Sequence, residues 1–328
     1  MGGARPRRGE KAVGRARGSS AGLAAGPAGG PATRRTSARG PSREVGHFYF
    51  PNFVSIDDGR AIEEWLAALR PIWERRHRRG AGPERWLLRP VYWLGSWQFA
   101  CLDYYRPPNG TAERCVRAEP FPKVLRELVT RAEQLARERF RGADLPSGWR
   151  LNTCLVNFYG SRLEDGRWVD AARVGEHRDF EPGPVASISI GERALLQFVA
   201  RSRPGEPAPV VLTQWLDDRS LQLFGGRFFK DQTLHRVQRV DRRSGRELPP
   251  AIEGFRTRRV NFTFRFVPEE HVATYAELSA RTRGDVREYV ERLAEGSPFF
   301  RRALAAEKRD GAKPATRSPS IERDGAVD

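Results

Sequence analysis

The feature that most constrains the fold is a series of short strand-like segments in the second half of the chain, with turn residues between them. Short strands at this regular spacing, separated by Gly, Pro or Asp, are typical of antiparallel sandwiches and jelly rolls. The candidate strands occupy residues 154–159, 172–179, 185–191, 194–200, 209–216, 220–226, 233–240 and 258–267. We therefore predict a mainly β protein with flanking helices and a double-stranded β-helix (jelly-roll) core.

Helical segments are predicted on both sides of this core. Residues 57–78 and 121–140 carry apolar residues at helical spacing, and Pro122 stands near the first turn of the second segment. An aromatic strand at residues 47–54 precedes them, and residues 269–295 return to a helical pattern. The chain thus divides into a basic tail (1–44), an N-terminal part with helices and a lid (45–150), the core (151–268), a C-terminal helical extension (269–308) and a polar tail (309–328). Both tails lack core-forming residues, so we expect them to be disordered.

The chain is strongly basic, which favours a polyanionic partner. Its formal net charge is +17, and 53 of its 58 basic residues are arginines. Such a charge suits nucleic acid first and anionic lipid second. An excess of Arg, Ala, Gly and Pro can also reflect a GC-rich coding sequence, so charge alone leaves the partner open. The ten basic residues of the N-terminal tail could contact phosphates or have no function.

Nothing in the sequence pattern indicates a membrane protein or an exported one. No apolar run approaches the roughly 18 residues that a transmembrane helix needs, and the N-terminal region lacks the continuous apolar segment of a signal peptide. The three cysteines, Cys101, Cys115 and Cys154, have no CxxC spacing, which favours a reducing compartment. We therefore expect a cytoplasmic monomer that does not bind membranes.

Two of the five histidines lie among the candidate strands. His177 and Asp179 form an H-x-D pair, and on a strand the two side chains would point to the same face. His235 lies on a later strand that could fold back opposite them. Two imidazoles and one carboxylate form the facial triad of non-haem iron(II) oxygenases, which leaves coordination positions open for other ligands. An H-x-D pair often arises by chance, so the prediction needs a second signal.

The last candidate strand, residues 258–267, supplies that signal. Because side chains alternate between the faces of a strand, one face would carry Val260, Phe262, Phe264 and Phe266. The other face would carry Arg259, Asn261, Thr263 and Arg265. Two inward guanidiniums need an anion to neutralise them, and a dicarboxylate such as 2-oxoglutarate matches their geometry. The alternative is a solvent-facing strand with scattered arginines.

An earlier strand carries two further polar residues, Asn157 and Tyr159, at alternate positions. They could present an amide and a phenol to the same interior space. Alternatively, the tyrosine caps an edge of the core.

These residues occur in four blocks whose order resembles the AlkB family of nucleic-acid dealkylating dioxygenases. The blocks are NFYG, VGEHRDFEPGPVASISIG, SLQLFGG with TLHRVQ downstream, and RRVNFTFRF. The resemblance covers about residues 150–267 and, more loosely, residues 45–150. It implies an Fe(II) site formed by His177, Asp179 and His235. It also implies a 2-oxoglutarate site formed by Asn157, Tyr159, Arg259, Asn261 and Arg265. In such enzymes 2-oxoglutarate and O2 are cosubstrates, and an N-methyl carbon is hydroxylated and released as formaldehyde.

The substrate is less constrained by the sequence. Glu181 stands where the AlkB family often has a carboxylate near the target base, but it could equally be a surface residue before a proline. Residues 91–105 resemble the family's nucleotide-recognition lid, in which Trp97 could stack on a flipped base or belong to the core. Residues 109–123 match nothing in the family.

The leading hypothesis is oxidative demethylation of N-alkylated bases in DNA or RNA. The alternative keeps the chemistry and changes the substrate to a protein or a small molecule. A third possibility is a basic binding protein whose jelly roll has lost catalysis, which the intact triad and the arginine pair disfavour.

Overall fold

The computed structural model describes residues 46–76, 85–98, 115–201, 206, 208–238 and 245–311. All of the described residues belong to one compact unit. The predicted basic tail and nearly all of the predicted polar tail lie outside the described residues, as does the second half of the predicted lid.

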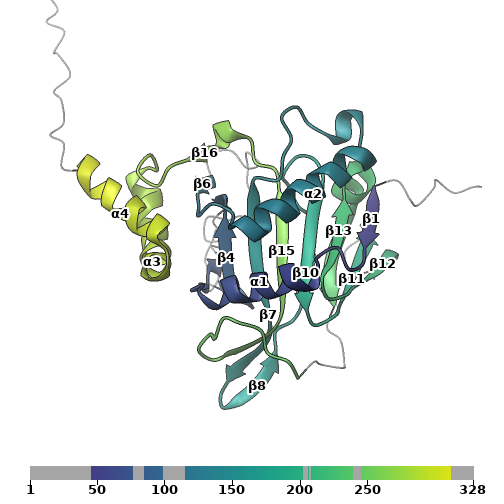
Figure 1. Cartoon of the computed structure of the whole chain (residues 1–328), viewed down its shortest axis with the longest axis horizontal. Coiled ribbons are helices and arrows are strands. Elements are labelled where there is room, and N and C mark those ends of the chain that lie inside the picture. Colours follow the sequence, from purple (N-terminus) through teal and green to yellow (C-terminus); the bar gives the residue numbers. More distant parts are fainter. Residues whose placement is uncertain are drawn as a thin grey trace, which may run out of the picture. The chain divides into compact units, whose positions relative to one another are not determined.

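The larger of the two main sheets is antiparallel and contains seven strands (Figure 1). Its spatial order is β1-β13-β10-β15-β7-β4, with β8 added beside β7. The strand bounds are β1 (His47–Phe50), β4 (Val91–Leu94), β7 (Thr153–Glu164), β8 (Arg167–Asp170), β10 (Val185–Gly191), β13 (Ser220–Phe224) and β15 (Phe255–Arg265). The N-terminal part of the chain thus contributes β1 and β4 to the same sheet as the predicted core.

The smaller main sheet has four strands in the order β12-β11-β14-β9. These are β9 (Val174–His177), β11 (Ala194–Ala200), β12 (Val210–Leu216) and β14 (Thr233–Gln238). A π-helix, Phe228–Gln232, links β13 to β14 and so connects the two sheets. Two antiparallel sheets with flanking helices confirm the predicted jelly-roll fold.

Two helices cover the outer face of the larger sheet (Figure 1). α2 (Lys123–Arg139) agrees with the predicted second helix, and α1 (Ile56–Ala67) begins after the capping residue Ser55. The apolar face of β15 packs beneath this helical layer. Phe262 meets Trp65 of α1 at a ring distance of 6.3 Å, and Phe264 meets Phe121, which precedes α2, at 5.7 Å. The alternation predicted for β15 therefore places its apolar side chains in the core, where all are buried.

The prediction that the first helix continues to residue 78 was wrong. α1 ends at Ala67 because Pro71 lacks the N–H that a helix interior requires and disfavours helical geometry at the preceding residue. Ile72 instead exchanges two backbone hydrogen bonds of 2.9 Å with Val91. A two-stranded sheet, β2 (Arg75–Arg76) with β3 (Arg85–Trp86), follows.

The prediction that the helical pattern begins at residue 269 was wrong, because the C-terminal extension starts with a short 3-10 helix and a strand. A short 3-10 helix, Glu269–His271, leads into β16 (Val272–Ala273), which pairs in parallel with β6 (Cys115–Arg117). β6 also pairs with β5 (Ser96–Gln98). The helices begin later, as α3 (Ala280–Gly296) and α4 (Pro298–Gly311). Pairing with β6 uses the backbone groups that a continuous helix would need.

Among the residues that the structure describes, no helix combines the length and apolar character needed to cross a membrane.

Candidate metal centre and adjoining cavities

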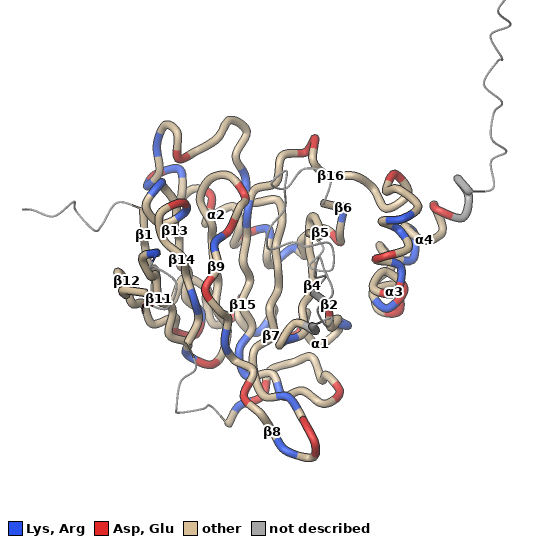
Figure 2. The backbone as a smooth tube through the Cα atoms, turned by 180° about the vertical axis from the view of Figure 1, so that it is seen from behind, with Lys and Arg blue, Asp and Glu red and all other residues tan. Residues whose placement is uncertain are grey.

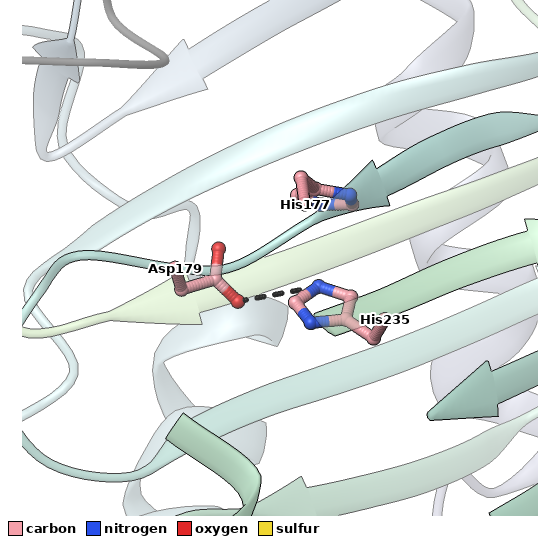
Figure 3. A group of neighbouring side chains, drawn as sticks. All are labelled: His177, Asp179 and His235. Atoms are coloured by element: carbon pink, nitrogen blue, oxygen red, sulfur yellow. Dashed lines mark ion pairs between the residues drawn. The ribbon is translucent and has the colours of Figure 1, made fainter. Parts of the chain in front are cut away.

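The predicted triad residues lie close together, on β9, in the loop after it and on β14 (Figure 3). His177 of β9 is paired in register with His235 of β14, and their ring centroids are 4.2 Å apart. His235 Nε2 lies 3.6 Å from Asp179 Oδ2, and one possible ligand atom of each residue falls within 4.8 Å of the others. Two imidazoles and a carboxylate at this spacing could hold a divalent transition metal such as Fe(II).

The sequence had suggested that both residues of the H-x-D pair lie on a strand, but only His177 does. β9 ends at His177, and Asp179 lies two residues beyond it in the following loop. The carboxylate reaches the site because Arg265 holds it. Asp179 Oδ1 accepts a hydrogen bond from Arg265 Nε at 2.8 Å, and Arg265 Nη2 forms an ion pair with the same oxygen at 2.7 Å. An ion pair with β15, rather than strand alternation, therefore positions the third residue of the triad.

The protonation states suit metal binding. Burial lowers the pKa of His177, and burial together with the nearby His177 lowers the pKa of His235 to about 3. Both rings are thus neutral near pH 7, with a lone pair available. His177 Nδ1 lies 2.8 Å from the carbonyl oxygen of Gly175, which fixes the proton there and leaves Nε2 as the ligand atom.

Asp179 remains ionised in this setting. Burial by itself would raise the pKa of the carboxyl, but Arg265, His235 and Lys230 together hold it well below its usual range. Its Oδ2 is buried and accepts no hydrogen bond from the described residues. Buried polar atoms normally have a partner, so this oxygen is a natural ligand atom for a cation.

The polar face of β15 lines a cavity between the two main sheets. Arg259, Asn261 and Arg265 are each at most 5% exposed, so the alternative of a solvent-facing strand is wrong. Arg259 Nη2 donates to Ser189 Oγ at 3.0 Å, while its Nε and Nη1 are buried without a hydrogen-bond partner among the described residues. Two unpartnered nitrogens on a buried guanidinium favour an anionic ligand such as a carboxylate.

Asn157 and Tyr159 line the same cavity, together with a residue that the sequence did not single out. Arg89 is buried, and its Nε donates to Asn157 Oδ1 at 2.8 Å. Its guanidinium carbon lies 5.1 Å from the centre of the Tyr159 ring, and that of Arg259 lies 4.9 Å from the same ring. Arg89 stands before Pro90 in a different segment from the other blocks, and no local pattern marks it.

The three predicted metal ligands, His177, Asp179 and His235, are called the metal group below. A second cavity, of about 510 Å³, is lined in part by Asp179 of this group. Glu181 and Lys230 line it, and Arg178, Phe180 and Arg227 lie around it. Glu181 is 3% exposed, with its Oε2 3.5 Å from Arg265 Nε, so it is not the surface residue that the alternative reading allowed. Its carboxylate is instead a wall of the cavity beside the metal group.

Trp97 does not reach either cavity, and its predicted stacking role is not supported. It is 0% exposed, and its Nε1 donates to Glu74 Oε1 at 2.7 Å. Tyr289 of α3 and Phe300 of α4 meet its ring edge-on, at 6.1 and 6.4 Å. The alternative reading, a core tryptophan, holds because the C-terminal helices cover this side of β5.

The fold and site together define a jelly-roll protein with a two-histidine, one-carboxylate metal group next to a buried anion pocket. The family model for the 2OG-Fe(II) oxygenase superfamily matches residues 46–265, more than half of the chain. The chain therefore belongs to the 2OG-Fe(II) oxygenase superfamily. It is an oxidoreductase of the dioxygenase type, and its family uses Fe(II), 2-oxoglutarate and O2. The His–Asp–His group and the partnerless N–H groups of Arg259 fit the first two.

Three of the similar solved structures are each distant from this chain in sequence. OsALKBH1 is 21% identical, with a TM-score of 0.42, and the match covers 68% of this chain and 98% of that chain. The ribosomal oxygenase YcfD from Escherichia coli, solved with cobalt and 2-oxoglutarate, is 12% identical with a TM-score of 0.28, covering 86% and 58%. A bsmA homolog from Methylobium petroleophilum PM1 is 14% identical with a TM-score of 0.33, covering 71% and 91%. No curated protein sequence matches the chain. None of these likenesses specifies a substrate.

Proposed function

We propose that this dioxygenase demethylates N-alkylated bases in DNA or RNA. The observation that carries the proposal is the cavity of about 510 Å³ that shares Asp179 with the metal group. Its volume lies within the range of small-molecule sites. A base must leave the stack to reach such a pocket, and a bound base would then lie directly beside the metal ligands.

In this proposal His177, Asp179 and His235 hold Fe(II). Arg259 binds a carboxylate of 2-oxoglutarate through a guanidinium nitrogen that has no partner among the described residues, and Asn157, Tyr159 and Asn261 complete that pocket. Arg265 orients Asp179 through a hydrogen bond and an ion pair to Oδ1. Bound iron, with O2 and 2-oxoglutarate, supplies the oxidising power for hydroxylation of an N-methyl carbon. The hydroxylated carbon then leaves as formaldehyde and the base is restored.

The surroundings of the second cavity suit a nucleotide. Phe180 is 39% exposed, and the Arg178 guanidinium carbon lies 5.2 Å from its ring centre. An exposed aromatic ring can stack on a base, and Arg178 and the exposed Arg227 can contact its phosphates. Figure 2 shows basic and acidic residues interspersed over many elements of the described chain. The net charge alone therefore does not select the substrate, and the proposal rests on the cavity.

The test offers oligonucleotides that carry 1-methyladenine, 3-methylcytosine or 1-methylguanine, in single- and double-stranded form. Restored base, formaldehyde and succinate are measured with Fe(II) and 2-oxoglutarate present, and the Asp179→Ala variant serves as the inactive control. We expect restored base and formaldehyde in equal amounts. Decarboxylation of 2-oxoglutarate without demethylation of any oligonucleotide would contradict the proposal and favour a protein or small-molecule substrate.

A further inference from the structure

Lys230 occupies an unusual position in the cavity beside the metal group. It lies on the π-helix Phe228–Gln232, and it lines the cavity together with Glu181 and Asp179. Its Nζ is buried and has no hydrogen-bond partner among the described residues. π-Helices often occur at functional sites. A buried amine without an acceptor is costly, so a ligand that supplies one would be favoured.

The residue type is also informative. Only five of the 58 basic residues of the chain are lysines, so a lysine is uncommon at any basic position. Arginine has a planar, always charged group, whereas lysine is a compact donor that fits a narrow pocket. Burial lowers the pKa of Lys230, and the carboxylates of Asp179 and Glu181 act in the opposite direction. In either protonation state the nitrogen keeps N–H groups to donate.

We propose that Lys230 selects substrates with a carbonyl next to the methylated ring nitrogen, and 1-methylguanine in particular. This inference rests on the proposed function. In 1-methylguanine the O6 carbonyl on one side of N1 accepts a hydrogen bond, and the 2-amino group on the other side donates one. Lys230 supplies the donor that O6 needs, and the Glu181 carboxylate supplies an acceptor for the amino group.

1-Methyladenine is the matched competitor, because it carries the methyl group on the same ring nitrogen of the same ring system. Next to that nitrogen it presents an amino group, which cannot accept a hydrogen bond from Lys230. The two bases therefore differ at the atom that Lys230 is proposed to contact.

The experiment measures kcat/KM for demethylation of the two lesions in the same single-stranded oligonucleotide. The parent protein is compared with Lys230→Met, which keeps the length of the side chain and removes the donor. Lys123→Met is the control, since Lys123 is exposed at the start of α2 and lies in neither cavity. Joint Fe(II) and 2-oxoglutarate binding, measured by absorption, verifies that each variant is folded.

We expect the parent to prefer 1-methylguanine. Lys230→Met should lower the ratio of kcat/KM for 1-methylguanine to kcat/KM for 1-methyladenine roughly tenfold or more, the scale of one charge-assisted hydrogen bond. Lys123→Met should not change this ratio. A parent that prefers 1-methyladenine, or a ratio that is equal in the parent and Lys230→Met, would overturn the inference and leave the proposed function intact. Decarboxylation without demethylation of either lesion would overturn this inference, and the absence of demethylation of 3-methylcytosine as well would overturn the proposed function.

Discussion

The two cavities that meet at Asp179 are built in different ways. The proposed cosubstrate pocket, the cavity between the two main sheets, has walls of regular strands, in which Ser187 of β10 lies opposite Thr263 of β15 and both residues line the cavity. The second cavity is lined by the loop after β9, by the segment that follows α2 (residues 143–146) and by the segment that contains the π-helix. Strand alternation constrains the first pocket tightly, whereas the second depends on how loops pack. When one site is built from strands and the other from loops, the loops can change to accept another substrate while the strands keep the cosubstrate site unchanged.

The largest expected effect lies where both cavities meet. His177→Ala, Asp179→Ala and His235→Ala should each reduce Fe(II)-dependent 2-oxoglutarate decarboxylation to background, because each removes one of the three protein ligands of the metal. Succinate formation is the measurement, and His271→Ala, in the segment after β15, is the histidine control. Full decarboxylation by any of the three variants would remove that residue from the triad.

The next prediction tests whether Trp97 stabilises the core or binds the substrate. Trp97→Ala should destabilise the fold by about 3–5 kcal/mol, the usual cost of removing a buried tryptophan. Trp168→Ala should cost under about 1 kcal/mol, because Trp168 is 41% exposed and its contact is with the Arg256 guanidinium. Urea unfolding of both variants measures the difference. Equal stability of Trp97→Ala and the parent, together with lost demethylation, would restore a substrate role for Trp97.

Within the strand-built pocket, Arg259→Lys should weaken 2-oxoglutarate binding by about 1.5–3 kcal/mol, because the compact ammonium of lysine does not replace the planar set of N–H donors of a guanidinium. Arg256→Lys is the matched control on the same strand, where Arg256 is exposed and pairs with Glu247 at 3.3 Å. The dissociation constant of 2-oxoglutarate is measured in each. Equal affinity in Arg259→Lys and the parent would mean that the cosubstrate binds elsewhere.

The smallest effect is expected in the loop-built cavity. Phe180→Ala should slow demethylation about tenfold at low substrate, since base stacking on an aromatic ring contributes about 1–3 kcal/mol. Decarboxylation without substrate should not change, because Phe180 does not line the cosubstrate pocket. Phe228→Ala is the control, as Phe228 is 40% exposed but does not line the second cavity. A loss of decarboxylation in Phe180→Ala would show that the two cavities are not separable.

The sequence predicted the strand-built parts well, because period-two alternation and turn residues mark them. β10 and β11 have the predicted bounds, and the polar face of β15 lies in the interior. The strand assignment of Asp179 was wrong, since an ion pair with Arg265 rather than alternation brings it to the site. Arg89 and Lys230 had no periodic signal, because each reaches its cavity through tertiary packing. The scarcity of lysine in the chain was the one sequence feature that could have drawn attention to Lys230.

The central claim is that His177, Asp179 and His235 hold an iron ion to which 2-oxoglutarate also binds. An anaerobic titration with Fe(II) and 2-oxoglutarate, followed by visible absorption, tests it without any assumption about the substrate. A weak metal-to-ligand charge-transfer band should appear only when both are present, and it should be absent from a folded Asp179→Ala variant. A folded parent protein that gives no such band, or an Asp179→Ala variant that gives it in full, would contradict the account.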